Sequence, residues 1–354
     1  MNLLYSNLKF LRYREHLQAL GEKRVVAPVH VRIKPMNYCN HNCWYCAYRH
    51  DNLQLGEDMD LADQIPRTKM FEIAADLIEM EVKAVTFSGG GEPLLYKPLP
   101  ELVEKLAGAG IRVAALTNGA NLKGKVADAF AQHATWMRVS MDGWDGASYA
   151  KSRSIKDDAF GKLLDNLTAF AASGTDCVLG VSFIIDQANH AHISEICERV
   201  RDAGVNHVKL SPVVVGNSVA ENNKYHDQIK DAVTDQIEAA TALDTPDFKV
   251  INHYHELPDL FDKPYSMCAY LQFLTVIGAD CGVYTCQDKA YTDGGLLGSI
   301  KDIRFKDFWY SEENRKNLFA FDPRASCRHH CVTHSKNLAI MEYLSLDQEH
   351  GHFV

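Results

Sequence analysis

The chain has 354 residues, of which 46% are hydrophobic and 23% are charged, and its formal net charge is −9 at pH 7. This length predicts one large domain, or one large and one small domain, of ordinary globular composition. The acidic balance, without a long basic block, argues against a nucleic-acid backbone as the main partner.

The N-terminal stretch contains Lys9, Arg12 and Arg14 and lacks an apolar core of signal-peptide length. A run of about 18 apolar residues, as a membrane span would need, is not found in the sequence. We therefore expect a cytoplasmic protein with no membrane partner. In that compartment its ten cysteines are ligands or reduced thiols rather than disulfides.

Apolar periodicity predicts an amphipathic helix over residues 3–20, which we expect to cover one end of the core. From residue 29 onward strands alternate with helices, and this order predicts a parallel sheet with helices outside it. The expected strands are 29–34, 83–88, 111–117, 136–140, 178–185 and 207–210, and the expected helices are 67–80, 98–108, 123–132, 158–172 and 192–203. Six such units predict an α/β fold, a partial (β/α)6 TIM-like barrel whose ligands gather at the C-terminal ends of the strands.

Beyond the barrel, residues 221–243 are expected to form a polar helix and residues 257–264 a linker. A hairpin of 271–277 and 283–285, a helix near 304–319 and a last helix opening at 327–331 are then predicted. The expected domains are an N-terminal helical cap (1–27), the barrel (28–258) and a small C-terminal hairpin-plus-helix domain (259–354).

Three cysteines, Cys39, Cys43 and Cys46, follow the first predicted strand at spacings of four and three residues. Thiolate is a soft ligand that favours zinc or the iron of an iron–sulfur cluster. A closed structural site normally has four protein ligands, whereas three cysteines on a 4Fe–4S cubane leave one iron open. A zinc knuckle completed by His41 or His50, and cysteines that are merely buried, remain the alternatives.

Residues 85–93, Val-Thr-Phe-Ser-Gly-Gly-Gly-Glu-Pro, are typical of a buried strand that runs into a glycine turn followed by a carboxylate. Consecutive glycines let a ligand approach the backbone, and exposed amides together with Glu92 suit a ligand that carries an ammonium group. We therefore expect Gly90→Val to exclude such a ligand by steric conflict.

The spacing CxxxCxxC after the first strand, with Gly-Gly-Glu-Pro after the second, resembles the radical S-adenosylmethionine (SAM) superfamily over roughly residues 28–215. The resemblance implies a 4Fe–4S cluster on Cys39, Cys43 and Cys46 with SAM on the open iron, where SAM is cleaved to a 5′-deoxyadenosyl radical. It also implies SAM contacts from Tyr45, Gly89, Gly90, Gly91, Glu92, Pro93, Asn118, Ser140, Asp142 and Arg153. A solvent-exposed charge for Arg153, and a mere turn former for Asn118, remain the alternatives.

Two cysteines that bracket the predicted hairpin and a later close pair resemble the short "twitch" form of the SPASM-type auxiliary-cluster domain. The resemblance implies one auxiliary 4Fe–4S cluster held by Cys268, Cys286, Cys327 and Cys331. Cys281 is interpreted as a spare thiol or a swapped ligand. A zinc site made of the four cysteines, or one that includes His329 or His330, stays open because the same ligands suit both metals.

The resemblance to twitch-domain dehydrogenases implies oxidation or epimerisation of a small hydroxylated metabolite, such as a sugar, nucleotide sugar or aminocyclitol. Oxidation follows if the auxiliary cluster accepts an electron, and epimerisation follows if a thiol returns a hydrogen atom. The candidate donors are Cys177, Cys197 and Cys281, although Cys177 and Cys197 also fit apolar packing.

We expect a flavodoxin- or ferredoxin-type electron donor. A peptide- or protein-modifying enzyme in the manner of sulfatase maturases is the alternative, and a non-catalytic zinc-binding scaffold is a third hypothesis.

Overall fold

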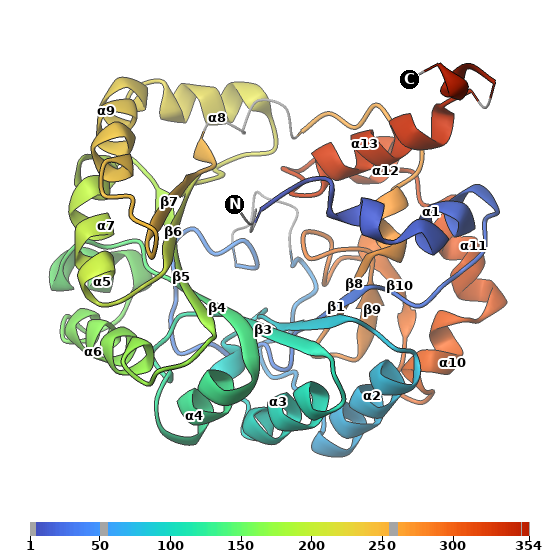
Figure 1. Ribbon diagram of the computed structural model, residues 1–354, viewed down its shortest axis with the longest axis horizontal. Coiled ribbons are helices and arrows are strands. Elements are labelled where there is room, and N and C mark those ends of the chain that lie inside the picture. Colours follow the sequence, from blue (N-terminus) through green and yellow to red (C-terminus); the bar gives the residue numbers. More distant parts are fainter. Residues whose placement is uncertain (1–4, 50–55, 255–260, 348, 354) are drawn as a thin grey trace.

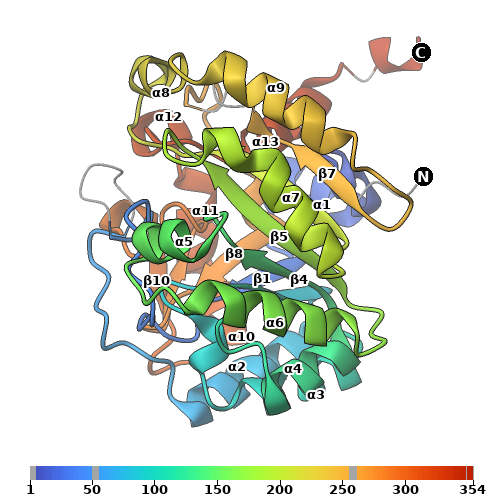
Figure 2. The same ribbon diagram turned by 90° about the vertical axis from the view of Figure 1, so that its left-hand side faces the viewer.

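The computed structural model describes residues 5–49, 56–254, 261–347 and 349–353. Among these residues ten strands form one sheet, whose middle is a run of parallel strands in chain order from β1 to β7. The sheet is curved, and helices cover its outer side (Figures 1 and 2). The parallel strands are β1 (His30–Ile33), β2 (Ala84–Phe87), β3 (Arg112–Thr117), β4 (Ala134–Ser140), β5 (Val178–Ile185), β6 (His207–Pro212) and β7 (Lys249–Asn252). This topology confirms the predicted α/β fold of the partial-barrel type.

Strand β1 shows how the sequence divides the two faces of the sheet. Val31 and Ile33 are buried in the main hydrophobic core, whereas His30 and Arg32 alternate with them and keep partial exposure. Alternate side chains of a strand point to opposite faces. The apolar core therefore lies between the strands and the outer helices, and the inner face of the sheet carries polar side chains.

The outer helices of the barrel are α2 (Arg67–Glu79), α3 (Leu99–Gly108), α4 (Gly124–His133), α5 (Gly146–Arg153), α6 (Ala159–Ala171), α7 (Ile193–Asp202), α8 (Val219–His226) and α9 (Lys230–Thr241). The five predicted barrel helices end within one residue of the expected positions. Helix α5 was not predicted. It begins with a capping box, in which the Asp145 carboxylate accepts from the Ser148 amide at 2.7 Å and the Ser148 hydroxyl accepts from the Asp145 amide at 3.0 Å.

The single helix predicted over residues 221–243 is wrong, because the chain forms α8 and α9 there. The His226 ring ends α8 by bonding the Val213 carbonyl at 2.8 Å and the Tyr254 hydroxyl at 3.1 Å. These contacts tie the helix end to two distant segments, so the helix does not continue straight. Strand β7, which follows α9, was also not predicted and extends the parallel run.

The helix predicted over residues 3–20 is wrong in its first half. The described part begins with a bend and a turn over residues 5–8, followed by a 3-10 turn η1 (Lys9–Arg12) and helix α1 (Arg14–Gly21), and residues 1–4 lie outside the described ranges. Leu17 and Leu20 pack in a small cluster with Phe273 and Ile340. The N-terminal helix therefore covers C-terminal elements instead of one end of the barrel core.

The predicted hairpin is confirmed as β8 (Leu274–Ile277) and β9 (Gly282–Tyr284), and β10 (Leu296–Ser299) adds to it. Strand β8 also pairs in parallel with β1, His30 against Leu274, so the C-terminal part extends the barrel's own sheet. The expected boundary at residue 258, and residues 257–260 of the expected linker, lie outside the described ranges.

The C-terminal helices are α10 (Phe305–Trp309), α11 (Glu312–Ala320), α12 (Pro323–Ser326) and α13 (His334–Ser345). One helix was expected near 304–319, but Ser311 breaks it by accepting from the Asn314 amide at 3.1 Å and so capping α11. Short 3-10 turns are η2 (Pro93–Leu95), η3 (His190–His192), η5 (Ala269–Gln272), η6 (Asp293–Gly295) and η7 (His350–His352). Within the part of the chain that is described, every helix is too short or too polar to cross a bilayer.

Candidate metal and cofactor site

The first cysteine loop and the glycine turn lie side by side at the C-terminal ends of β1 and β2. The Gly91 amide donates to the Met36 carbonyl at 3.1 Å, and the Glu92 amide donates to the Tyr38 carbonyl at 2.9 Å. A Cβ atom at Gly91 would lie 2.0 Å from the Tyr38 carbonyl oxygen. Glycine is therefore required at this position by the segment that leads into Cys39.

Gly90 and Gly89 are constrained by the protein itself. A Cβ atom at Gly90 would meet the Asn37 Oδ1 atom at 2.2 Å and the Met59 sulfur at 2.8 Å. The Gly89 carbonyl accepts from the Lys34 Nζ atom at 2.9 Å. Valine at position 90 would therefore displace Asn37 and Met59 as well as exclude a ligand, and the expected loss of ligand binding stays a prediction.

Helix α5 holds the cysteine loop from the other side. The Asn42 amide donates to the Arg153 carbonyl at 3.0 Å, and the Trp44 amide donates to the Ser152 carbonyl at 3.3 Å. The last carbonyls of a helix lack partners within the helix, and here the loop supplies donors to them. The loop is therefore fixed to α5 by backbone hydrogen bonds from residues that lie between the three cysteines in the sequence. All three cysteines keep partial exposure.

The three thiols of this loop are spaced more widely than the ligands of one zinc ion. A tetrahedral zinc with bonds of about 2.3 Å to sulfur brings its thiolates to about 3.8 Å from one another. Cys39, Cys43 and Cys46 do not form a set of donors within 4.8 Å of one another. A cubane holds each thiolate on a different iron and so spreads its ligands further. His50, one alternative zinc ligand, lies outside the described residues.

Burial raises the pKa of Cys39 to about 11 and raises the pKa of Cys46 as well. Thiolate is the form that binds metal. A bound cluster would therefore supply the positive charge that lets these thiols ionise.

Glu92 and Asn118 join the glycine turn to the cysteine loop. The buried Glu92 carboxylate accepts from the Leu94 amide at 2.9 Å, the Thr117 hydroxyl at 2.6 Å and the Asn118 amide at 2.7 Å. The Asn118 side chain donates toward the Cys39 sulfur at 3.8 Å, and its Oδ1 atom accepts from the Ala120 amide at 3.0 Å. Asn118 is thus a turn former that also contacts a thiol. The role of Glu92 toward SAM stays a prediction.

Asp142, at the end of β4, is the centre of a buried polar cluster. Its Oδ2 atom accepts from both the Tyr45 hydroxyl and the Arg153 guanidinium, and its Oδ1 atom accepts from the Ile184 amide at 2.8 Å. The alternative of a solvent-exposed charge for Arg153 is wrong, because this side chain is 3% exposed. Ser140 lies on the inner face just before this cluster and keeps partial exposure.

Buried polar atoms without a partner gather around this loop. Among the described residues they include Asn37 Oδ1, His41 Nδ1, Ser88 Oγ and Arg153 Nε, which belong to the cysteine loop, the glycine turn or the residues that support them. Buried polar groups in folded proteins almost always have partners. A ligand with amino, carboxylate and hydroxyl groups would provide them, so these residues fit a SAM molecule.

The second set of cysteines also converges. Cys268 precedes η5, Cys286 follows β9, and Cys327 and Cys331 lie between α12 and α13. Burial raises the pKa of all four thiols, and the pKa of Cys286 is raised further by Asp288 and by the other three. Such mutual effects require proximity. Four neighbouring thiols that repel one another as thiolates fit a cationic metal centre.

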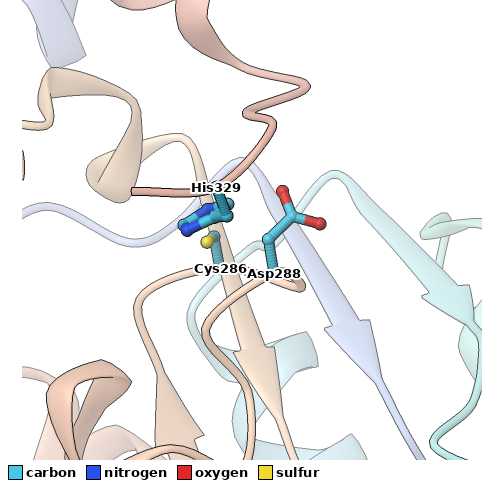
Figure 3. Close-up of side chains that lie close together, drawn as sticks. All are labelled: Cys286, Asp288 and His329. Carbon is cyan, nitrogen blue, oxygen red and sulfur yellow. The ribbon is translucent and has the colours of Figure 1, made fainter. Parts of the chain in front are cut away.

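Cys286, Asp288 and His329 form the one group of three donors that lie within 4.8 Å of one another in the described residues (Figure 3). Neither ring nitrogen of the buried His329 has a hydrogen-bond partner. Burial, with Lys263 as the next cause, lowers the pKa of His329 to about 3. This arrangement keeps a mononuclear metal site open as an alternative at the second centre.

The remaining three cysteines lie apart from both sets. Cys281 has φ +63° in the hairpin turn and packs in the main core, where its electrostatic neighbours are Lys69 and Asp280. Cys177 precedes β5, at the opposite end of the barrel from the cysteine loop, and Cys197 is buried in α7. The structure therefore places none of the three suggested hydrogen donors with the site residues.

Lys34 is a candidate site residue that sequence reasoning missed. It follows β1 and is 1% exposed, with its Nζ atom 4.0 Å from the centre of the Tyr48 ring. Burial, and then the nearby Arg32, lower the pKa of Lys34 to about 7. The signal in the sequence is the alternation His-Val-Arg-Ile-Lys, which puts three basic residues on one face of a strand.

Comparison with known proteins agrees with this geometry. Residues 33–200 match the model of the Radical SAM superfamily. GTP 3′,8-cyclase of Synechococcus elongatus is 30% identical over 181 residues, which are 49% of this chain and 51% of the relative. The chain spans about half the length of the curated relatives it matches.

Two solved structures share the fold. SuiB of Streptococcus suis bound to S-adenosylmethionine superposes with a TM-score of 0.60 at 15% identity, covering 94% of this chain and 80% of SuiB. Native anSMEcpe with bound AdoMet gives a TM-score of 0.59 at 14% identity, covering 90% of this chain and 96% of that protein. At these identities the likeness is one of fold, and it includes the C-terminal elements.

Proposed function

We propose that this chain, whose residues 33–200 match the Radical SAM superfamily model, is a radical SAM oxidoreductase acting on a small hydroxylated metabolite such as a sugar or nucleotide sugar. The thiols of Cys39, Cys43 and Cys46 would hold a 4Fe–4S cluster, and the glycine turn would face the amino group of SAM. When bound, these cofactors supply reductive cleavage of SAM and removal of a hydrogen atom from an unactivated carbon. The observation that carries the proposal is the open three-thiol loop surrounded by buried polar atoms without partners.

The protein's own task at this site is to hold the loop and to orient the ligands. Asp142 fixes both Arg153 and Tyr45 through hydrogen bonds, so these side chains are ordered before a ligand arrives. The Arg153 Nε atom has no partner within the described residues and is available to a carboxylate. The Asn118 side chain donates toward the Cys39 sulfur, which would stabilise that thiolate.

The positions of the cysteines favour oxidation over epimerisation. All ten cysteines lie in described residues, and seven of them belong to the two thiol sets. Epimerisation needs a further thiol that returns a hydrogen atom, but Cys177, Cys197 and Cys281 lie elsewhere. Oxidation of a C–H bond next to a hydroxyl releases one hydrogen atom, one proton and one electron. We propose the four-thiol set as the site of an auxiliary 4Fe–4S cluster that takes the electron, in a twitch-like domain.

Two other functions remain as alternatives. The structural likeness to SuiB, which has also been solved with its precursor peptide SuiA, favours a peptide-modifying enzyme. The relative named GTP 3′,8-cyclase favours a small molecule as the substrate.

We propose a flavodoxin- or ferredoxin-type protein as the electron donor. A zinc-binding scaffold without catalysis predicts zinc in place of iron.

Anaerobic reconstitution with iron and sulfide, followed by reduction in the presence of SAM, tests the proposal. The expected product is 5′-deoxyadenosine, and deuterium from a labelled sugar or nucleotide-sugar substrate should appear in its methyl group. Deuterium transfer from a labelled peptide, with none from the sugar substrates, would favour the peptide-modifying enzyme. Zinc without acid-labile sulfide, and no 5′-deoxyadenosine, would overturn the proposal.

A further inference from the structure

The inner face of the barrel carries a row of basic side chains. Arg32 and Lys34 alternate with the core residues of β1 and its extension, and Arg138 alternates with the buried Met137 and Val139 of β4. Arg32 and Arg138 act on each other electrostatically, so their charges lie close together across the sheet. Two strands that are not neighbours in the sheet therefore bring their cations to one place.

Further basic groups line the same face. The Tyr5 hydroxyl accepts from the Arg138 guanidinium at 3.1 Å and bonds the His207 ring at 3.2 Å. The Lys209 Nζ atom lies 6.0 Å from the centre of the Tyr5 ring. The N-terminal segment, which Figure 1 shows entering the space enclosed by the strands, thus meets a basic surface.

This basic surface does not follow from the overall composition. The chain has 46 acidic and 37 basic residues, yet the sequences of β1 to β7 contain no aspartate or glutamate. Asp288 is the acidic group that acts on both Arg32 and Lys34. One carboxylate does not balance two arginines, which stay charged in proteins.

Three of these cations, Arg32, Lys34 and Arg138, also lack an anionic partner among the described residues. In the described ranges, no ion pair within 4.0 Å involves Arg32, Lys34 or Arg138, and the buried Nε atom of Arg32 has no hydrogen-bond partner. The Lys34 ammonium bonds neutral oxygens of Tyr48 and Gly89. A guanidinium that is partly shielded from water and has no anion beside it is unfavourable, and a bound anion would restore the balance.

Lys34 places this surface between the two thiol sets. Cys46 of the first set and Cys286 of the second both act electrostatically on its ammonium. Cys286 also acts on Arg32. A molecule bound to Arg32 and Lys34 would therefore lie between the two candidate metal centres, next to the glycine turn.

We propose that this inner face binds a phosphate-bearing small molecule, with Arg32 and Arg138 on the phosphate oxygens and Lys34 beside them. The guanidinium fork matches phosphate geometry and can bind two oxygens at once. The identification of this molecule as the substrate rests on the proposed function. Among the candidate substrates, sugar phosphates and nucleotide sugars fit this face, whereas a cationic aminocyclitol would be repelled by it.

Calorimetric titration of the anaerobically reconstituted full chain tests the anion site without requiring turnover. The probes are UDP-glucose, glucose 1-phosphate, glucose and a glutamate-rich peptide. UDP-glucose or glucose 1-phosphate should bind and glucose should not, and stronger binding of UDP-glucose identifies a nucleotide diphosphate as the source of the phosphate. Arg32→Gln and Arg138→Gln should each weaken binding at least about tenfold. The control is Arg112→Gln, on the exposed start of β3, and it should leave binding unchanged.

Three outcomes would overturn the anion site. In the first, the protein binds neither UDP-glucose nor glucose 1-phosphate, and in the second, wild type and Arg32→Gln bind these ligands equally well. The third outcome is tighter binding of the glutamate-rich peptide than of either phosphate compound. Circular dichroism of each variant separates loss of the site from loss of the fold. The same preparations are assayed for 5′-deoxyadenosine. Phosphate binding without 5′-deoxyadenosine would refute the proposed function and leave the anion site standing. Production of 5′-deoxyadenosine without phosphate binding would refute the anion site and leave radical SAM activity standing.

Discussion

Asp142 and Arg153 form an ion pair that is almost completely buried beneath the first cysteine loop, with side chains 2% and 3% exposed. Asp142 lies just beyond the end of β4, and Arg153 lies in the last turn of α5, where its carbonyl accepts from the Asn42 amide of the loop. The pair therefore joins the sheet to the helix that holds the three thiols.

Replacing Asp142 with asparagine should destabilise the protein strongly. The change leaves the Arg153 guanidinium buried without its anion, and breaking a buried pair in this way costs about 3–5 kcal/mol. Urea unfolding measures the loss. The matched control is Asp158→Asn, which removes an exposed i,i+4 pair with Lys162 and should cost less than about 1 kcal/mol. Equal losses in the two variants would contradict a structural role for the Asp142–Arg153 pair.

Cys43→Ala should abolish formation of 5′-deoxyadenosine from SAM. Two thiolates leave the cluster short of a ligand, and the cluster is lost or cannot bind SAM in the same geometry. Chromatography of the quenched reaction measures the product. Cys177→Ala is the control, since this buried thiol lies at the other end of the barrel, and the variant should keep the activity. Continued 5′-deoxyadenosine formation by Cys43→Ala would refute the assignment of this loop as the ligand of the cluster that binds SAM.

Replacing Cys327 and Cys331 together with alanine should lower iron from about eight to about four atoms per chain. The first cluster and its cleavage of SAM should persist, because the two thiol sets lie on different loops. Iron and acid-labile sulfide analysis measures the change.

The group of Cys286, Asp288 and His329 gives this experiment a second arm. Under the four-thiol assignment, Asp288→Asn combined with His329→Gln should keep about eight iron atoms. If instead a single metal ion occupies that group, this second variant loses the metal and the alanine pair keeps it. Either result decides between the two ligand sets.

How far the site could be predicted depends on how local each interaction is. Cys39, Cys43 and Cys46 are recognisable because ligands of one loop lie a few residues apart in the sequence. The barrel strands were also predictable, since buried parallel strands are short apolar runs bounded by turns. Lys34 was not recognised, because its burial between the two thiol sets depends on Tyr48 and Asp288, which are distant in the sequence.

The errors in the fold have the same origin. No local pattern says that β8 pairs with β1, because a strand's neighbour is chosen by packing across the whole fold. The break between α8 and α9 depends on the bonds of His226 to Val213 and Tyr254. Helix propensity alone cannot show such contacts.

The last prediction concerns stability in acid. Burial, and then the charge of Arg32, lower the pKa of His30 from its usual 6.5 to about 3, while its ring bonds the Thr86 hydroxyl at 2.8 Å. Between these two pKa values the unfolded chain binds a proton at His30 that the folded chain does not. The free energy of unfolding therefore falls as pH falls below about 6.5, by about 1.4 kcal/mol per pH unit for this group.

His30→Gln keeps a side chain able to bond Thr86 and removes the titration. Urea unfolding of wild type and variant from pH 7.5 to 5.0, at about half-unit steps, should show a shallower decline for His30→Gln. The control is His350→Gln, an exposed residue near the C-terminus, which should follow the wild-type curve. Parallel curves for wild type and His30→Gln would mean that this histidine takes up its proton in the folded barrel. In that case the inner face would admit one more positive charge, and its need for a bound anion would be weaker than the geometry of Arg32 and Arg138 indicates.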